Sequence, residues 1–175
     1  MAPILLNKVL AVDLGGGDLR SGRIVEVEAY GGTDDAASHA ARGPTPRNAP
    51  MFARAGTVYV YFTYGMHWCA NIVTGPPGDA QAVLLRAVVP LTGLDAIRAA
   101  RPRARRERDL ADGPAKLCQA LGIGAWANGV DLGRRGAAPS ITLLDDGVAP
   151  PAEPTTGPRI GISVATDTPW RFRVP

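Results

Sequence analysis

The side chains best suited to acid–base chemistry beside an aromatic ring gather in one part of the chain, between residues 23 and 71. This part holds one histidine of a long loop, His39, and a glutamate of a predicted strand, Glu28. It also holds all four tyrosines of the chain, which are Tyr30, Tyr59, Tyr61 and Tyr64. A carboxylate among several aromatic faces suits an enzyme that holds a planar ring and breaks a bond next to it.

Glu28 belongs to the segment 23–30, whose apolar and polar side chains alternate as in a half-buried β-strand. The alternation puts Glu28 and Tyr30 on one face, and the side chains expected on the other face are Val25, Val27 and Ala29. A glutamate in this position is either an ordinary solvent-facing residue or, in a cleft, a base that takes a proton from water. An arginine beside it would hold it in place and keep it ionised.

Arg86 is the arginine that the sequence offers for this purpose. It interrupts the almost continuously apolar segment 82–89, which predicts a buried central strand. A cation among buried apolar side chains must be paired with an acid or must face a polar cavity. Both a purely structural ion pair and a role in a site fit this pattern.

The tyrosines of the second half of this part lie on a predicted hairpin. Segment 57–62 alternates with Tyr59 and Tyr61 on one face, and 67–73 reads as the returning strand. Strand packing alone would explain these two rings. Tyr64 lies at the tip between the strands, where there is no core to fill, and aromatic side chains at such tips can enter a base step.

The remaining pattern predicts one α+β domain over residues 1–175. Residues 4–12 read as an apolar strand or a helix leading into a strand, and the long connection before residue 57 contains one helical turn near 36–39. Further expected elements are helices at 93–100 and 114–121, the latter begun by Asp112 or Gly113, little regularity at 124–158, and closing strands at 159–164 and 170–174.

Composition limits the classes of protein and partner. The chain has 46% hydrophobic and 20% charged residues and no apolar run of transmembrane length, so we expect no membrane partner. No signal peptide is visible and the two cysteines form no C-x-x-C, which favours a reduced cytoplasmic protein. The net charge of +3 and the arginines crowded between residues 98 and 108 fit either a solvated face or a surface that follows phosphates.

Cofactor motifs are missing from the sequence. There is no P-loop, no G-x-G-x-x-G that opens a helix, and no G-x-S-x-G. The two histidines and the nearby cysteine have no zinc-ligand spacing. We therefore expect no metal, no nucleotide cofactor and no other cofactor.

Six blocks of the chain, taken together, resemble the alkyladenine (3-methyladenine) DNA glycosylase family in its small bacterial form. They occur in the family's order and with similar gaps, and they cover nearly the whole chain: R-I-V-E-V-E-A-Y, A-S-H-A-A-R-G-P-T-P-R-N-A, Y-V-Y-F-T-Y-G-M-H-W-C-A-N, V-L-L-R-A, G-P-A-K-L-C-Q-A-L-G-I and P-R-I-G-I-S. The resemblance implies a curved antiparallel β-sheet with surrounding helices, from which the Tyr64 hairpin protrudes.

The activity implied by the resemblance is that of a monofunctional glycosylase in base-excision repair. It would flip and hydrolytically excise alkylated or deaminated purines from double-stranded DNA, without cutting the strand through a Schiff base. Glu28 would be the general base that activates the water attacking C1′ of the deoxyribose. Arg86 and the main-chain carbonyl of Ile160 would help to position this water. A monomer in the bacterial cytoplasm, associated with the nucleoid, is the expected form.

The resemblance also assigns residues that bind DNA. Tyr64 would enter the duplex at the vacated position, and Asn71 would disfavour guanine through its amino group. Tyr30 and Tyr61 would stack on the flipped base, and His39 would stack on it or form a hydrogen bond with its edge. Phosphate contacts are implied for Thr45, Arg47 and the turn before Lys116.

Two other functional classes compete with this interpretation. A non-catalytic lesion or minor-groove binder would keep Tyr64 and the arginines, but it would be expected to replace Glu28 or Arg86, and both are present. A small-molecule nucleoside hydrolase would need a cluster of carboxylates for sugar or metal, and only Asp34 and Asp35 adjoin the loop. The sequence therefore favours the glycosylase.

Overall fold

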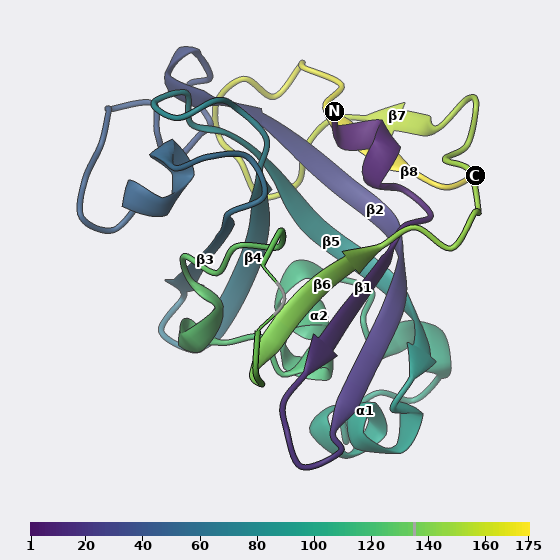
Figure 1. The fold of residues 1–175 in the computed structure, drawn as a ribbon. Coiled ribbons are helices and arrows are strands. Elements are labelled where there is room, and N and C mark those ends of the chain that lie inside the picture. The colour runs from purple at the N-terminus through teal and green to yellow at the C-terminus, as the bar shows by residue number, and fades with distance from the viewer. Residues whose placement is uncertain (135) are drawn as a thin grey trace.

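The computed structural model describes residues 1–134 and 136–175, and over this range it forms one curled antiparallel sheet with two α-helices (Figure 1). The strands follow the order β3-β4-β5-β2-β1-β6, and β8 pairs with both β2 and β7. Their bounds are β1 Val9–Asp13, β2 Leu19–Gly31, β3 Val58–Thr63, β4 His67–Val73, β5 Gln81–Thr92, β6 Ser140–Leu144, β7 Thr155–Gly157 and β8 Arg171–Arg173. The expected α+β class and curved sheet are confirmed.

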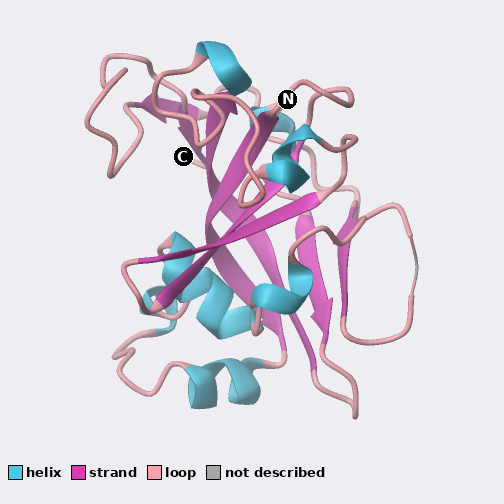
Figure 2. Ribbon diagram, turned by 90° about the vertical axis from the view of Figure 1, so that its left-hand side faces the viewer, coloured by secondary structure: helices cyan, strands magenta, loops and turns pink. Residues whose placement is uncertain are grey.

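The two helices, α1 (Leu94–Ala100) and α2 (Pro114–Leu121), lie together at one end of the sheet, as Figure 2 also shows. Gly113 precedes α2 and Pro114 takes its first position, where the missing N–H of proline costs no hydrogen bond. Gly122 ends α2 in the left-handed conformation with φ of 71°. Both helices were predicted at these positions, and of the two candidates for the start of α2 it is Gly113 that forms the N-cap.

The main hydrophobic core lies between the helices and the sheet. It contains the fully buried side chains of Ile97 from α1, Leu117 from α2 and Ile24 from β2. A second, smaller cluster holds Tyr59 and Met51. The rings of Tyr59 and Tyr61 pack on this second cluster while Val58 and Val60 belong to the main core, so the predicted alternation of the hairpin strand is confirmed.

Strand β2 departs from the regular alternation expected for residues 23–30. Its register with β5 shifts between Ile24 and Glu26 and again between Glu26 and Val27. Ile24 and Val27 are both buried in the core whereas Val25 lies outside it, because a bulge changes which face a side chain takes. Beyond the bulge Glu28 and Tyr30 share one face, as predicted.

Three other predictions about elements are corrected. Segment 36–39 forms turns, and the helical turn is a 3-10 helix just before it, at Gly32–Asp34. Residues 159–164 are not a strand, since Gly161 has φ of 79° and the N–H of Ile160 bonds to a side chain. Region 124–158, apart from residue 135 outside the described residues, is less irregular than expected, because β6 pairs with β1 and β7 pairs with β8.

The first segment and the last strand agree with their predictions. A 3-10 helix at Ala2–Leu5 leads into β1, which is the helix-to-strand alternative, and β8 falls within 170–174. Within the described residues, no helix combines the length and the apolar character needed to cross a membrane. Further 3-10 helices lie at Ala49–Phe52, Glu107–Asp109 and Ala125–Ala127.

Candidate active site

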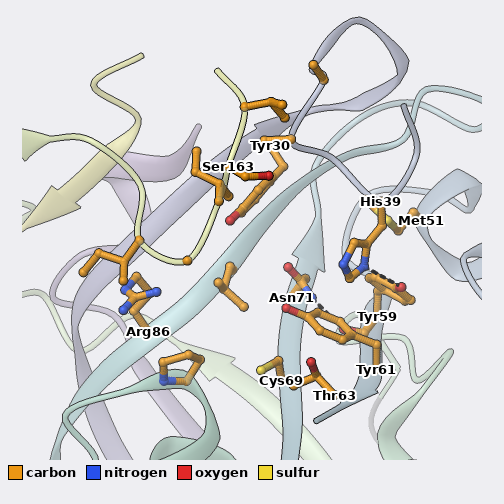
Figure 3. Close-up of a pocket in the computed structure, with 18 of the residues that line it drawn as sticks. Tyr30, His39, Met51, Tyr59, Tyr61, Thr63, Cys69, Asn71, Arg86 and Ser163 are labelled. Carbon is orange, nitrogen blue, oxygen red and sulfur yellow. Dashed lines mark hydrogen bonds between the residues drawn. The ribbon is translucent and has the colours of Figure 1, made fainter. Parts of the chain in front are cut away.

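A cavity of about 510 Å³ opens between β2, β5, the β3–β4 hairpin and the segment 160–164. Figure 3 shows Tyr30 and Arg86 on one side of it and His39, Tyr59 and Tyr61 on the other. We call these the carboxylate side, which comprises Tyr30, Arg86, Ile160 and the glutamate behind them, and the aromatic side, which comprises His39, Tyr59, Tyr61 and Tyr64. The volume is within the usual range for small-molecule pockets and suits a single purine.

Glu28 lies directly behind the wall of the carboxylate side. Its side chain is fully buried, so the solvent-facing alternative is wrong. Oε1 accepts the N–H of Ile160 at 2.8 Å and lies 3.2 Å from Nη1 of Arg86. Oε2 accepts the hydroxyl of Tyr30 at 3.0 Å. All three neighbours line the cavity, whereas Glu28 itself is not among the lining residues, so its carboxylate lies behind these neighbours.

Arg86 is paired with acids and also faces the cavity, so its position is compatible with a role in the site, which stays a prediction. It lines the cavity, and it also pairs with a second carboxylate, since its Nε lies 3.0 Å from Oε1 of Glu26. Glu26 in turn lies 3.5 Å from Nη1 of Arg171 in β8. The guanidinium is thus fixed between two glutamates of the bulged strand, which is how a cation is tolerated with 9% exposure.

The aromatic side is held together by ring contacts and one hydrogen bond. His39 Nδ1 lies 3.0 Å from the hydroxyl of Tyr59, and its ring meets that of Tyr61 edge-on at 4.4 Å between centroids. Burial, helped by the positive charge of Arg47, lowers the pKa of His39, so the ring is neutral at pH 7. Burial likewise raises the pKa of Tyr59 and of Tyr61, which keeps both hydroxyls protonated.

Asn71 and Cys69 from β4 form the floor between the two sides. The Asn71 amide is buried and its Nδ2 donates to the carbonyl of Tyr59 at 3.1 Å. Burial raises the pKa of the Cys69 thiol, so it is a neutral group at pH 7. Asn71 therefore lines the cavity as the resemblance implied, while its contact with a base stays a prediction.

Tyr64 occupies the tip of the β3–β4 hairpin at the mouth of the cavity. Its side chain is 83% exposed and its backbone is left-handed, with φ of 51°. A tyrosine in this conformation is uncommon, because side chains with a Cβ disfavour positive φ. The tip therefore presents a bare aromatic ring to solvent, as predicted.

Among the candidate phosphate contacts, Thr45, Arg47 and Lys116 are exposed and outside the cavity, whereas the turn before Lys116 borders the cavity at Pro114. Thr45 bonds Asn48, with 2.9 Å between its Oγ1 and Oδ1 of that residue. Arg47 donates from Nη2 to the carbonyl of Phe62 at 2.7 Å, and so braces the hairpin. Lys116 pairs with an aspartate one helical turn earlier. Within the described part of the chain, three of the six crowded arginines form ion pairs, namely Arg98 with Glu107, and Arg106 and Arg108 with Asp109.

Several site residues were missed by the sequence analysis. Strand packing alone explains the Tyr59 ring in the sequence, but in the structure its hydroxyl also lies within hydrogen-bond distance of His39. Asn48 donates to the carbonyls of His39 and Gly43 and so shapes the loop. Asp35 and Arg159 form a buried ion pair beside Glu28. The position of Arg159 next to Ile160 in P-R-I-G-I-S was the one available signal for that pair.

Among residues 1–134 and 136–175, no group of three or more His, Cys, Asp or Glu side chains is placed to hold an ion. The groups at the cavity are a carboxylate, a guanidinium, main-chain amides and aromatic rings. Such a set can activate water beside a stacked base.

Comparison with known proteins agrees with this chemistry. The family profile described as methylpurine-DNA glycosylase matches residues 1–175. A protein of Burkholderia lata is 58% identical over 175 residues, which is 100% of this chain and 82% of that protein. Proteins of Nocardia farcinica (49% identity, 91% of this chain and 79% of that protein) and Streptomyces avermitilis (45%, 98% and 80%) are also similar. All three carry the name "Putative 3-methyladenine DNA glycosylase". The chain belongs to the methylpurine-DNA glycosylase family.

Proposed function

We propose that this DNA glycosylase excises alkylated or deaminated purines, of the 3-methyladenine type, by hydrolysis with Glu28 as general base. The supporting observation is the fully buried Glu28 carboxylate behind a purine-sized aromatic cavity, with its oxygens held by Tyr30, Arg86 and Ile160. Damaged purines with positive charge have a weakened glycosidic bond and leave without prior protonation. The enzyme then needs to flip the base, stack it and supply activated water.

The water would bind Oε2 of Glu28. A carboxylate offers about four lone-pair positions, two on each oxygen. Within the described residues Oε1 meets both Ile160 N–H and Arg86, whereas Oε2 meets the hydroxyl of Tyr30. The second position on Oε2 is left for a water, which would approach C1′ of a nucleotide seated in the cavity. Arg86 and the carbonyl of Ile160 would orient this water, and the charge of Glu28 would stabilise oxocarbenium character at the sugar.

Base recognition would fall to the aromatic side together with Tyr30. Tyr30 and Tyr61 would stack on the flipped base, with a gain of about 1–3 kcal/mol per ring and a preference for cationic bases. Neutral His39 would stack on the base or bond its edge. The Asn71 amide would disfavour the amino group of guanine, since a misplaced polar group costs about 1–3 kcal/mol.

The DNA itself would be duplex, with Tyr64 filling the position of the flipped nucleotide. Thr45, Arg47 and Lys116 would contact phosphates around it. No lysine is among the described residues that line the cavity, so we expect no Schiff base and a monofunctional enzyme, with no cofactor or metal. It would act as one domain and one monomer, in the cytoplasm at the bacterial nucleoid. A non-catalytic binder is not favoured, because Glu28 and Arg86 are both present and in contact.

A labelled duplex with one hypoxanthine or one ethenoadenine tests the proposal. Wild-type protein should create a site that breaks in hot alkali, and Glu28→Gln should bind the same duplex without creating it. Methylated DNA provides a third substrate if the cavity refuses the first two. Equal cleavage by both proteins would show that Glu28 is not the general base. If wild type cleaves none of the substrates, the non-catalytic binder becomes the favoured interpretation.

A further inference from the structure

Arg159 is a buried cation that the proposed chemistry does not use. Its side chain has 0% exposure. Nη1 and Nη2 bind the two oxygens of Asp35, with 2.9 Å between Nη2 and Oδ1, and Nη1 also donates to the carbonyl of Ala29 at 3.0 Å. Its Cζ lies 4.7 Å from the centroid of the Tyr30 ring and 5.2 Å from that of Trp170. The guanidinium is therefore paired at its fork and covered by a ring of the base pocket.

Asp35 extends this arrangement to the loop of the aromatic side. Besides Arg159 it accepts the N–H of Gly31 at 3.0 Å and the N–H of Ala37 at 3.1 Å. Burial alone would raise the pKa of Asp35, but the hydrogen bonds from Arg159 and from the two amides outweigh it, and the net pKa is lowered. An ionised Asp35 thus ties the end of β2 to the loop that carries His39 two residues after Ala37.

We propose that the Asp35–Arg159 pair is a positioning device that orients both oxygens of Glu28. Arg159 directly precedes Ile160, whose N–H binds Oε1 of Glu28 at 2.8 Å. The ring over which Arg159 lies belongs to Tyr30, whose hydroxyl binds Oε2 at 3.0 Å. Each oxygen of Glu28 thus accepts a hydrogen bond from a group next to Arg159. For Oε1 this group is the N–H of the following residue, Ile160, and for Oε2 it is the hydroxyl of Tyr30, whose ring packs on the guanidinium. The inference rests on the proposed role of Glu28 as general base.

Trp170 makes the device specific for arginine. Its carbonyl accepts the N–H of Ala29 at 2.9 Å, and its ring lies so close to Gly31 that a Cβ there would approach within 3.1 Å. Arg159 Nε is buried and, among the described residues, without a hydrogen-bond partner, which leaves packing against the rings of Tyr30 and Trp170 as its environment. A lysine would keep the charge but would lose the two-pronged pairing and the planar contact with the rings.

Arg159→Lys is the decisive variant. A misplacement of about 1 Å in a catalytic group costs about 100-fold in rate. We expect the single-turnover excision rate at saturating enzyme to fall by about this factor, with unchanged affinity for undamaged duplex. Arg20→Lys is the matched control, since Arg20 lies in β2 outside the cavity and forms a similar two-pronged pair with Asp18, through Nε at 2.8 Å and Nη2 at 2.7 Å. It should excise at the wild-type rate.

Amide hydrogen exchange gives a second measurement that does not depend on activity. The N–H of Ile160 should exchange faster in Arg159→Lys than in wild type, and equally slowly in Arg20→Lys. Trp170→Phe keeps the ion pair and should give a smaller change in the same direction, which covers the case that Arg159→Lys does not fold.

The two measurements separate this inference from the proposed function. Wild-type excision rate in Arg159→Lys, or unchanged Ile160 exchange in it, would overturn the positioning role while Glu28 stays the base. Absence of excision by wild type would instead contradict the proposed function, and the exchange of Ile160 would still decide whether Arg159 orients it. Equal rate losses in Arg159→Lys and Arg20→Lys would reduce the pair to general stability and overturn the inference.

Discussion

The two sides of the cavity are built in opposite ways. The aromatic side stands mainly on the β3–β4 hairpin, whose strands are adjacent in sequence and pair directly, from Val58 opposite Ile72 to Thr63 opposite His67. The carboxylate side joins distant parts of the chain: Glu28 and Ile160 are separated by 132 positions, and Asp35 and Arg159 by 124. One side is mainly local and rests on edge-on and tilted ring contacts, and the other is non-local and rests on charge.

We expect this difference to separate binding from chemistry. Stacked rings tolerate small displacements, because the attraction between faces changes gradually and every base has a π-face. A general base must be placed to within hydrogen-bond reach of the proton that it removes. We therefore expect changes on the aromatic side to alter affinity and substrate choice, and changes on the carboxylate side to alter the rate of excision.

The largest effect is expected for Glu28→Gln. The shape of the side chain is kept and its basicity is lost, so single-turnover excision should fall by about 100-fold to 10,000-fold. Lesion-DNA affinity should be retained within a few-fold. Glu26→Gln is the matched control, since Glu26 contacts the same Arg86 but pairs with Arg171 and not with the cavity-lining groups of Tyr30 and Ile160, and it should lose far less rate. Comparable excision rates for Glu28→Gln and Glu26→Gln would contradict the assignment of Glu28 as general base.

Tyr64→Ala should produce the largest change in affinity. Loss of an intercalating ring costs about 1–3 kcal/mol, which corresponds to roughly 5-fold to 150-fold in affinity for lesion DNA. Tyr64→Phe keeps the ring and should bind as wild type does. Fluorescence anisotropy with an abasic or ethenoadenine duplex measures both. Unchanged affinity of the alanine variant would show that Tyr64 does not fill the position of the flipped nucleotide.

Arg47→Ala should weaken binding to every sequence. If Arg47 contacts one phosphate, the slope of log affinity against log salt concentration should become shallower by about 0.9. Arg47 also braces the hairpin through the carbonyl of Phe62. A loss confined to lesion DNA, with an unchanged salt slope, would assign Arg47 to support of the aromatic side and not to phosphate binding.

Tyr59→Phe should have a smaller effect that is confined to the aromatic side. The variant removes the hydroxyl that lies 3.0 Å from His39 Nδ1 and keeps the buried ring. A hydrogen bond of this kind contributes about 1 kcal/mol, so affinity for a flipped ethenoadenine should fall about fivefold. The excision rate of the bound complex should stay the same; a loss of rate at full binding would connect His39 to the chemistry.

The smallest effect concerns pH. The lowered pKa of His39 means that the unfolded chain binds a proton there more readily than the folded one as pH falls below 6.5. The free energy of unfolding should therefore rise with pH in this range and reach its full value above it. Urea titrations of wild type and His39→Gln at several pH values measure this, and the variant should show a weaker dependence. Parallel curves would show that His39 has an ordinary pKa.

The two sides also differ in how much of each could be predicted from sequence patterns. The face shared by Tyr59 and Tyr61, the exposed tip at Tyr64 and the turn that returns β4 were all predicted. The reason is that strand alternation and turn residues act over a few positions. On the carboxylate side the same patterns identified Glu28 and Arg86 as candidates, and the resemblance named Ile160.

Local patterns failed where a distant partner decides the conformation. Segment 159–164 is apolar enough to predict a strand, but its first residues turn their polar groups toward Glu28 and Asp35. Strand β6 was missed for the same reason, because its pairing partner β1 lies more than a hundred residues earlier. The bulge near Glu26 was missed as well, since it depends on the register with β5.

By itself the sequence determined which chemical groups are present, that the strand with Tyr59 and Tyr61 alternates, and that a helix spans 114–121 after Asp112 or Gly113. Tertiary structure alone decided that the Ile160 N–H meets Glu28 and that Arg159 is enclosed by Asp35, Tyr30 and Trp170. The physical reason is that a buried polar group must find its partner wherever the fold brings one close, and no local pattern of hydrophobicity specifies that partner.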